Sequence, residues 1–335
     1  MHPYEALTPD LVIDALEARG LPCDGRLQAL SSYENRVYQA SLEDGRVAVV
    51  KFYRPGRWNE AQILEEHAFA LELAQADVPV VAPWVLDGST LHLHGGFHYA
   101  VSPRRGGRAP ELEDAEVLEW IGRFLARLHA VGEARPFLHR PALDASRYGQ
   151  ASREFLLGHG AMPLEVQSLW ARRCDEALAM VASHPVLVDA ASTDGQRLRL
   201  HGDCHVGNIL WTPVDMPTSA GPGPHFVDLD DACMGPAVQD LWMLLSGERA
   251  QRTWQLACLL DGYEQMREFD RRELALIEAL RTLRLIHYSA WLARRWDDPA
   301  FPRSFPWFGT RDYWMGQVQM LEDQLEAMAE PPLSA

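Results

Sequence analysis

The sequence is short of long apolar runs, of positive charge and of cysteines that could pair. No apolar run approaches the roughly 20 residues that span a bilayer, and the start of the chain lacks the basic and apolar segments of a signal peptide. We therefore expect a cytoplasmic protein with no membrane partner. The 31 Lys and Arg against 47 Asp and Glu give a net charge of −16, which argues against nucleic acid as a partner.

The five cysteines are odd in number and lack the spacing of a metal site, so we expect reduced thiols.

The chain does contain enough hydrophobic residues for a substantial core. Its 335 residues are 47% hydrophobic, which allows one large domain or two lobes.

The candidate catalytic residues lie in two stretches. These are His201-Gly202-Asp203-Cys204-His205-Val206-Gly207-Asn208 and, shortly after it, Val227-Asp228-Leu229-Asp230. His-x-Asp followed five residues later by Asn is the catalytic-loop spacing of kinases, where the Asp accepts the proton of the attacking hydroxyl and the Asn binds magnesium. Phosphoryl transfer needs a further carboxylate for the metal, and Asp228 follows its own apolar strand. The spacing predicts a phosphotransferase with Asp203 as base and Asn208 and Asp228 as metal ligands.

Two other functions compete with this prediction. A metallohydrolase would use His201, Asp203 and His205, because alternate residues of an extended segment face one side. The Asp228-Leu229-Asp230 segment resembles the Asp-x-Asp of phosphoaspartyl phosphatases, but the Thr expected soon afterwards is absent. Ordinary turn chemistry explains any one of these Asp and Asn residues, but not the set.

The first hundred residues predict a sheet with helices. A helix begins after Thr8 as cap, with Pro9 at its first position, and is expected to pack against strands at 25–30, 37–42 and 46–53. Ser31-Ser32-Tyr33-Glu34-Asn35 joins the first two strands, where hydroxyls and backbone N–H groups can hold phosphate oxygens. A plain polar hairpin is the alternative there.

Lys51 ends the run Val47-Ala48-Val49-Val50-Lys51, as a kinase lysine does that pairs the nucleotide phosphates with a helix glutamate. The next helix, predicted over 59–75, offers Glu65 and Glu66. Glu66 lies near the inward edge of the apolar stripe and Glu65 is turned outward by roughly 100°, so Glu66 is the predicted partner. Two exposed glutamates on a solvated face are the alternative.

Strands are predicted at 91–94 and 97–101, and the Pro-, Arg- and Gly-rich segment that follows suits a hinge. We therefore expect a nucleotide-binding lobe over 1–101, a hinge over 102–110 and a catalytic helical lobe over 111–335. Helices are predicted at 164–184, 239–245, 252–268 and 272–296. Asp240 could be a helix-start acid or an acceptor for the catalytic loop, and His129 is expected to be a packing histidine.

The sequence also resembles a known family. The Asp203 and Asp228 motifs resemble the aminoglycoside phosphotransferase and choline kinase superfamily, a relative of the protein kinases. Four further segments resemble the bacterial stress response kinase A group, over nearly the whole chain. They lie at 31–39, 51–55, 235–245 and 298–302. The resemblance implies an α+β, two-lobed, protein kinase-like fold with an N-terminal antiparallel sheet lobe and a mainly helical C-terminal lobe.

The same resemblance implies an ATP- and Mg²⁺-dependent Ser/Thr protein kinase that protects stressed cells and can phosphorylate itself. It makes Asp203 the proton acceptor, Asn208 and Asp228 the magnesium ligands and Ser32 a nucleotide contact, with Lys51 and Glu66 positioning phosphate. Protein substrates with Ser or Thr acceptors are the expected partners, and a monomer is the expected state.

The chain departs from ordinary protein kinases in lacking a Gly-rich loop and an Ala-Pro-Glu segment. A small-molecule kinase acting on an amino alcohol or aminoglycoside is therefore an alternative, and a nucleotide-binding scaffold without turnover is a third. Ser192, Thr193, Thr218 and Ser219 are candidate internal acceptors. The sequence leaves open whether Asp230 binds a second metal.

Overall fold

The structure is a computed structural model that describes residues 3–184, 187, 197–213 and 221–334. The chain divides into two units. The first comprises Met1–Glu111, Phe137–Arg140 and His205–Ala232, and the second comprises Leu112–Pro136, Pro141–Cys204 and Cys233–Ala335. The segment that carries Asn208 and Asp228 thus belongs to the first unit, whereas the predicted lobes divide the chain once, at a hinge. The assignment of the lobes and of the hinge remains a prediction.

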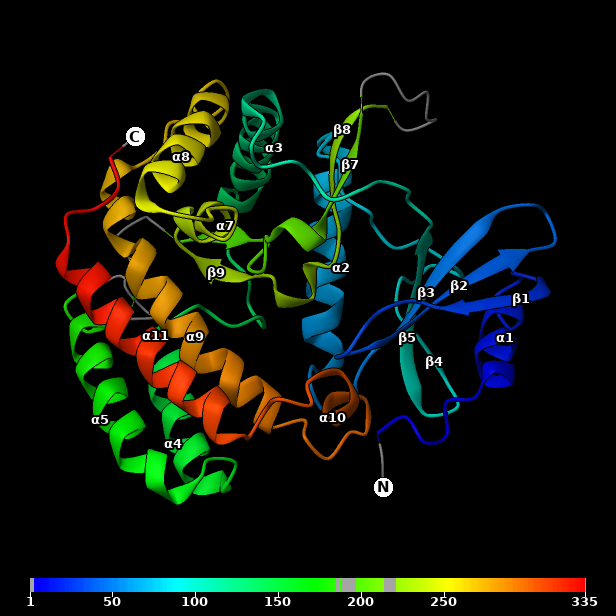
Figure 1. Cartoon of the computed structure of the whole chain (residues 1–335). Coiled ribbons are helices and arrows are strands. Elements are labelled where there is room, and N and C mark those ends of the chain that lie inside the picture. Colours follow the sequence, from blue (N-terminus) through cyan, green and yellow to red (C-terminus); the bar gives the residue numbers. More distant parts are fainter. Residues whose placement is uncertain (1–2, 185–186, 188–196, 214–220, 335) are drawn as a thin grey trace. The chain divides into compact units, whose positions relative to one another are not determined.

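A five-stranded antiparallel sheet forms the centre of the first unit (Figure 1). Its order is β1-β2-β3-β5-β4. The strands are β1 (Cys23–Ala29), β2 (Arg36–Leu42), β3 (Val47–Phe52), β4 (His92–His94) and β5 (Phe97–Pro103). Val50 of β3 pairs with Tyr38 of β2 and with Val101 of β5, so β3 lies inside the sheet. Each predicted strand of this sheet is therefore present, and no end differs from the predicted one by more than two residues.

Helix α1 (Pro9–Glu17) packs on one face of this sheet, as the sequence predicts. Thr8 caps it by accepting the backbone N–H of Leu11. Side chains from α1 and from alternate positions of the strands form one apolar cluster, which includes Val12, Leu16, Val50 and Phe52. Because side chains alternate along a strand, Lys51 lies on the opposite side of β3 from Val50 and Phe52.

Helix α2 (Glu60–Gln75) begins at Asn59, which forms a capping box with Gln62. The predicted start is within one residue of the observed one. Ile63 of α2 belongs to a second apolar cluster, with Tyr53, Leu91 and Ala100. The α2 helix therefore packs against residues at the ends of β3 and in β5, which brings its Glu66 toward Lys51.

A second, two-stranded sheet of the first unit is flanked by the two predicted metal ligands. It pairs β7 (Ile209–Thr212) with β8 (Gly223–Phe226). The 3₁₀ turn η2 (Val206–Asn208) precedes β7, and η3 (Leu229–Asp231) follows β8. Arg108 exchanges two backbone hydrogen bonds with Trp211, so β7 is also held by the 103–111 segment.

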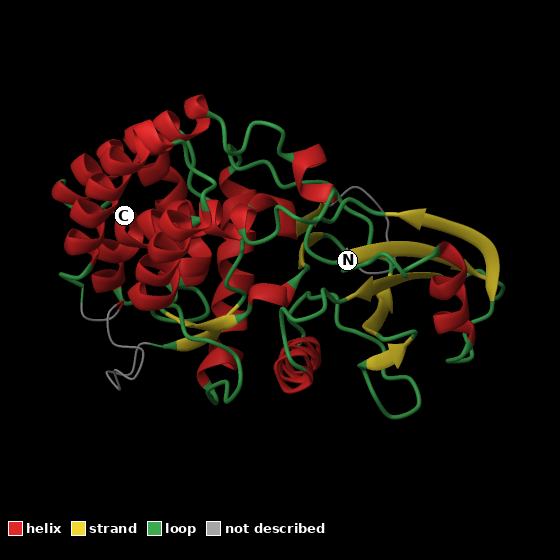
Figure 2. Ribbon diagram, turned by 90° about the horizontal axis from the view of Figure 1, so that it is seen from below, coloured by secondary structure: helices red, strands yellow, loops and turns green. Residues whose placement is uncertain are grey.

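Helices account for most of the second unit (Figure 2). They are α3 (Ala115–Glu133), the π-helical turn η1 (Ser146–Gln150), α4 (Ala151–His159), α5 (Leu164–Val181), α7 (Val238–Trp242), α8 (Arg249–Tyr263), the 3₁₀ turn η4 (Arg271–Leu276), α9 (Ile277–Ala293), α10 (Ala300–Ser304) and α11 (Arg311–Ala329). Two short antiparallel strands, β6 (Leu198–Leu200) and β9 (Cys233–Gly235), complete the unit.

Close packing between helices holds this unit together. Gly122 of α3 and Gly262 of α8 face the backbone of the opposite helix so closely that a Cβ at either position would lie 2.0 Å from a carbonyl oxygen. Trp170 of α5 and Trp314 of α11 are buried against each other, with ring centroids 5.7 Å apart. Phe301, Phe305 and Phe308 are also buried, whereas Trp307 of the same segment is 42% exposed.

Several helices differ from their predicted ranges. The helix predicted at 272–296 is a 3₁₀ turn followed by α9, and the predicted helix at 252–268 begins and ends earlier as α8. The π-turn η1 and the helices α4, α10 and α11 were not predicted. Within the described residues, none of the helices is both long enough and apolar enough to span a membrane.

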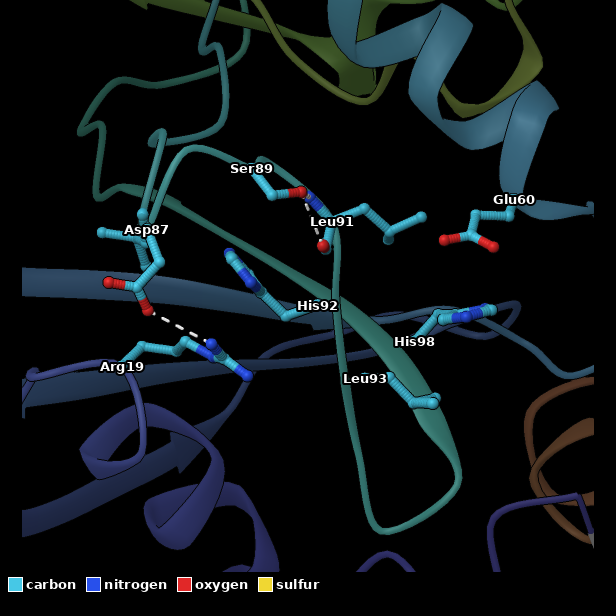
Figure 3. Close-up of a pocket in the computed structure, with 9 residues that line it drawn as sticks. Arg19, Glu60, Asp87, Ser89, Leu91, His92, Leu93 and His98 are labelled. Atoms are coloured by element: carbon cyan, nitrogen blue, oxygen red, sulfur yellow. Dashed lines mark hydrogen bonds and ion pairs between the residues drawn. The ribbon is translucent and has the colours of Figure 1, made fainter.

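A cavity of about 360 Å³ lies in the first unit beside β4 (Figure 3). The ion pair between Arg19 and Asp87 closes one side of it, and Glu60 and His98 line the other. None of the predicted site residues lines this cavity.

Candidate active site

The two predicted metal ligands occupy neighbouring positions at the end of the β7–β8 sheet. Asn208 ends η2, and Asp228 stands two residues after β8. The backbone N–H of Val227 donates to the carbonyl of Asn208 at 3.0 Å, which ties the two loops together. The side chain of Asp228 is 53% exposed, so its carboxylate is accessible.

Asp228 has an unusual backbone conformation, with φ 61° and ψ 62°. This left-handed region is uncommon for a residue with a Cβ, and it costs free energy that the surrounding contacts must supply. Such conformations concentrate at functional sites. The conformation directs the chain from β8 into η3, where Asp230 and Asp231 follow.

Lys51 of β3 forms hydrogen bonds with the segment that contains Asp228 and Asp230. Its ammonium group donates to Oδ1 of Asp228 at 2.9 Å and to Oδ1 of Asp230 at 3.3 Å. Burial alone would lower the pKa of Lys51, but Asp228 and Asp230 outweigh it and raise the pKa well above its ordinary value. Lys51 is therefore a fixed positive charge beside the accessible carboxylate of Asp228.

Glu66 is buried on the side of α2 that the sequence predicts, at 6% exposure. Among the described residues, however, no hydrogen bond or ion pair joins it to Lys51, and its Oε2 has no hydrogen-bond partner. Burial raises the pKa of Glu66 to about 7, although the nearby Lys51 acts in the opposite direction. Glu66 thus lies close to the lysine without bonding to it, and its predicted role with phosphate stays a prediction.

Glu65, which was predicted to turn outward, binds the backbone of the 138–140 segment. Its carboxylate accepts the backbone N–H groups of Leu138, His139 and Arg140. Arg140 then donates from its side chain to the carbonyls of Ala232 and Asp230. Through these contacts α2 is linked to the loop that follows Asp228, a connection that periodicity along the helix does not reveal.

The Ser31–Asn35 segment forms the β1–β2 connection. The hydroxyl of Ser32 donates to the carbonyl of Asn35 at 3.1 Å, which closes the loop on itself. The side chain of Asn35 donates to Oδ2 of Asp230 at 3.0 Å and accepts the backbone N–H of Arg54 at 3.1 Å. The loop is therefore attached to η3 through Asn35, and the nucleotide contact of Ser32 stays a prediction.

The predicted base Asp203 belongs to the second unit, and follows β6 after Gly202. Asp240 of α7 holds this loop, because its carboxylate accepts the backbone N–H of His201 at 2.8 Å and that of Gly202 at 2.9 Å. Of the two alternatives for Asp240, the structure thus shows an acceptor for the loop that carries Asp203, and the catalytic role of that loop stays a prediction.

His129 of α3 supports Asp240 from behind. Its Nε2 lies 3.1 Å from Oδ2 of Asp240, and its Nδ1 lies 2.9 Å from the hydroxyl of Tyr263. Burial alone would raise the pKa of Asp240, but the hydrogen bond and charge of His129, the charge of His201 and the backbone donor of Gly202 outweigh it and lower the pKa. His129 is a packing histidine, as predicted, and it also orients an acidic residue.

Sequence reasoning missed a cation beside Asp203. Arg284 of α9 forms an ion pair with Oδ1 of Asp203 at 2.6 Å. The side chain of Arg284 is 42% exposed and that of Asp203 is 20% exposed, so the pair lies at the surface of its unit. No local pattern around Arg284 marks it, because α9 reads as an ordinary helix.

The metallohydrolase alternative would bring His201, Asp203 and His205 around one metal. In the described part of the chain, no group of three or more His, Cys, Asp or Glu side chains has the arrangement of a metal site. His205 instead accepts the backbone N–H of Gly207 through Nδ1 at 3.0 Å. It thereby caps the turn η2, which ends in Asn208.

Comparison with known proteins identifies relatives along almost the whole chain. A family profile described as "Phosphotransferase enzyme family" matches residues 26–277. Stress response kinase A of Escherichia coli strain K12 is 46% identical over 98% of this chain and 96% of that protein. The serine/threonine protein kinase RdoA of Salmonella typhimurium strain LT2 is also 46% identical, with the same coverage.

Solved structures show the same fold at lower identity. An amicoumacin kinase in complex with AMP-PNP, Ca²⁺ and amicoumacin aligns with a TM-score of 0.70 at 18% identity, over 97% of this chain and 95% of that chain. A microcompartment-associated aminopropanol kinase aligns with a TM-score of 0.67 at 18% identity, over 94% of this chain and 95% of that one. The α+β fold with an antiparallel N-terminal sheet and a helical C-terminal part is thereby confirmed.

Proposed function

The chain belongs to the phosphotransferase enzyme family and is a kinase of the stress response kinase A group, and we propose that it is an ATP- and Mg²⁺-dependent Ser/Thr protein kinase. One observation supports the dependence on ATP and metal in this proposal. It is the ion pair between Lys51 and the exposed carboxylate of Asp228, at 2.9 Å. A strand lysine beside a metal-binding carboxylate is the arrangement that positions nucleotide phosphates in kinases. The name of the Salmonella relative supports Ser and Thr as acceptors.

The side chains of Asn208 and Asp228 fit a magnesium ion, because both offer the hard oxygen atoms that this cation prefers. When bound, the ion would neutralise charge on the transferred phosphoryl group. Lys51 already lies against Asp228, and its raised pKa keeps it protonated for binding to phosphate oxygens. Ser32 would contact the nucleotide from the β1–β2 loop, with Glu66 as the buried acid near Lys51.

In this proposal Asp203 accepts the proton of the acceptor hydroxyl, whose oxygen then bonds to the γ-phosphorus while ADP leaves. Asp240 holds the loop that carries Asp203 by two backbone hydrogen bonds, and Arg284 contacts the Asp203 carboxylate itself. These contacts restrict the orientation of the base before the acceptor arrives.

The acceptor is proposed to be a Ser or Thr of a protein, including the chain itself. A monomer in the cytoplasm, without nucleic-acid or membrane partners, is the proposed setting. The candidate internal acceptors Ser192, Thr193, Thr218 and Ser219 lie outside the described residues. The two structural neighbours are an amicoumacin kinase and an aminopropanol kinase, which keeps phosphorylation of an amino alcohol or aminoglycoside as the second candidate function.

The test is incubation of the pure protein with γ-labelled ATP and Mg²⁺, alone, with a generic protein acceptor and with amino alcohols. We expect label on protein Ser or Thr. The Asp203→Ala variant should transfer no phosphate while its nucleotide affinity stays within a few-fold of the parent, because the base acts on the acceptor and not on the donor.

Asp44→Asn, an exposed carboxylate of the β2–β3 turn, serves as the control and should behave as the parent does. Full transfer by Asp203→Ala would remove Asp203 from the role of base. Saturable phosphorylation of a small aminated alcohol by a chain that leaves proteins unmodified would overturn the protein-kinase assignment and favour the second candidate.

A further inference from the structure

Two of the three carboxylates in the Asp228–Asp231 segment have opposite environments. The Asp228 side chain is 53% exposed, whereas that of Asp230, two residues later, is 3% exposed. Both are aspartates after the same strand, so either could be taken for a metal ligand from the sequence. Their surroundings separate them, because a metal ligand needs an accessible lone pair and Asp230 is enclosed.

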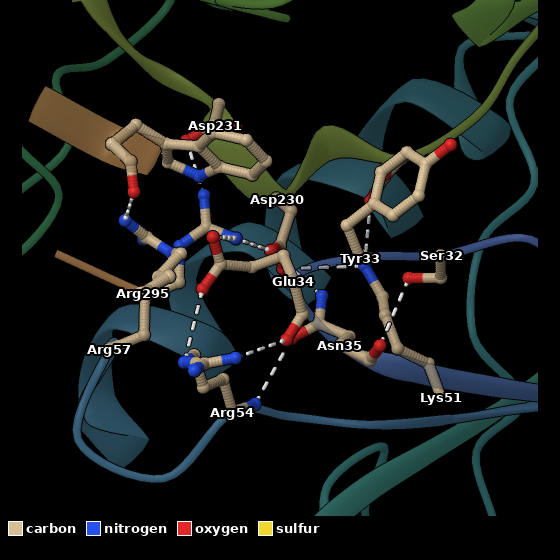
Figure 4. A network of polar contacts seen from close by, with 12 residues as sticks. Ser32, Tyr33, Glu34, Asn35, Lys51, Arg54, Arg57, Asp230, Asp231 and Arg295 are labelled. Carbon is tan, nitrogen blue, oxygen red and sulfur yellow. Dashed lines mark hydrogen bonds and ion pairs between the residues drawn. The ribbon is translucent and has the colours of Figure 1, made fainter. Parts of the chain in front are cut away.

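Each oxygen of Asp230 already has a donor (Figure 4). Oδ2 accepts from Nδ2 of Asn35 at 3.0 Å and from the guanidinium of Arg57, and Oδ1 accepts from Lys51 at 3.3 Å. Two cationic side chains and one amide therefore occupy both oxygens of this buried carboxylate.

Arg57 connects this carboxylate to the adjacent one. Its other terminal nitrogen donates to Oδ1 of Asp231 at 2.6 Å, and its side chain is 11% exposed. Burial alone would lower the pKa of Arg57, but Asp231, Asp230 and Glu34 outweigh it and raise the pKa. A guanidinium bonded to two successive carboxylates in this way holds η3 in one geometry.

Arg140 holds the same turn through its backbone. It donates to the carbonyls of Asp230 and Ala232, and its guanidinium lies 4.5 Å from the centre of the Trp58 ring. Together, Arg57 and Arg140 fix the side chains and the main chain of the segment that leaves Asp228 in its left-handed conformation. The cost of that conformation at Asp228 is offset by contacts made two residues later.

We propose that Asp230, Asn35 and Arg57 are positioning residues that hold the accessible carboxylate of Asp228 and the Ser31–Asn35 loop in register, and that Asp230 does not bind a metal. The inference rests on the proposed function, since it concerns the metal and nucleotide of that site. Metal binding at Asp230 would require loss of donors from Asn35, Arg57 or Lys51 in a buried place, where unpaired charge is costly.

The experiment counts Mn²⁺ bound per chain by electron paramagnetic resonance in the presence of ADP, and measures KM and kcat separately. The variants are Arg57→Lys, Asn35→Ala and Asp230→Asn, with Arg26→Lys as the matched control on an exposed arginine. Neither the Arg57 nor the Asn35 substitution removes a carboxylate. We expect all three site variants to bind the same number of Mn²⁺ ions as the parent, with Mn²⁺ affinity and KM for ATP each weakened by about tenfold and kcat changed by less.

The double variant Arg57→Lys, Asp230→Asn should lose little more Mn²⁺ affinity than either single variant, and its KM for ATP should be little higher. Both substitutions act through one contact, so their effects should not add. If Asp230→Asn does not fold, Arg57→Lys and Asn35→Ala carry the test by themselves. Loss of one bound Mn²⁺ in Asp230→Asn alone would overturn the inference and make Asp230 a ligand, and parental KM and Mn²⁺ affinity in Arg57→Lys and Asn35→Ala would overturn it too. If the parent binds neither ADP nor Mn²⁺, the proposed function itself fails.

Discussion

At the scale of single residues, the proposed metal ligands Asp228 and Asn208 differ in charge. We predict that Asp228→Asn lowers the rate of transfer by orders of magnitude, because loss of a carboxylate removes most of the attraction for the metal. Asn208→Ala should have a milder effect, since a neutral amide contributes less. A titration of kcat against Mg²⁺ concentration measures both, and excess Mg²⁺ should recover more activity in Asn208→Ala than in Asp228→Asn.

An equal loss of activity in Asp228→Asn and Asn208→Ala, without any change in the Mg²⁺ concentration required, would contradict this assignment of ligands. Activity that is supported by Zn²⁺ and needs no ATP would instead favour the metallohydrolase. The substitution Asp44→Asn again provides a carboxylate change outside the site.

At the scale of elements, the short helix α7 depends on a buried glutamate. Glu273 of η4 accepts the backbone N–H of Val238 at 2.8 Å and is 5% exposed. Burial raises the pKa of Glu273 from 4.5 to about 7, since the charged form is poorly solvated there, although backbone donors act in the opposite direction. Because α7 carries Asp240, this cap supports the element that holds the loop of Asp203.

The raised pKa of Glu273 predicts a pH-dependent stability. Between the unfolded and folded pKa values the native state binds the proton more tightly, so the contribution of Glu273 is fully present below pH 4.5 and is lost as the pH rises through about 7. The free energy of unfolding should fall by roughly 3 kcal/mol over this interval through this group. In Glu273→Gln that part of the fall should be absent, while the amide oxygen can still accept from Val238.

Denaturant unfolding at pH 5 and pH 8, in the parent and in Glu273→Gln, measures the effect as a difference between the two proteins. The surface substitution Glu264→Gln is the control and should follow the parent. If the free energy of unfolding depends on pH equally in the parent and in Glu273→Gln, the native state does not perturb the pKa of this carboxyl.

At the scale of the whole molecule, the net charge of −16 opposes close encounters between copies of the chain. We predict that self-phosphorylation is slow and occurs within one chain, so its rate per molecule should not change over a hundredfold range of protein concentration. Mass spectrometry of the protein after incubation with Mg²⁺ and ATP gives the rate, and Asp203→Ala should remain unmodified. A rate that rises in proportion to concentration, and faster in high salt, would indicate transfer between copies.

The elements nearest the proposed site were predictable from sequence because they depend on local patterns. The alternation in β3 places Val50 and Phe52 on one face and Lys51 on the other, and the 3.6-residue period of α2 buries Glu66. The spacing from Asp203 to Asn208 is likewise local. In contrast, α11 was missed because its buried residues are few, namely Trp314, Gln317, Val318 and Leu321.

The contacts that orient these residues depend on the tertiary structure. Asn35 and Arg57 meet Asp230 across separations of 195 and 173 residues, and His129 meets Asp240 across 111. No periodicity within a helix or strand encodes such pairings, because they form only when the chain has brought distant elements together. The sequence alone therefore determined which residue types could carry phosphoryl transfer, whereas burial in the folded chain decided that Asp228 is accessible and Asp230 is enclosed.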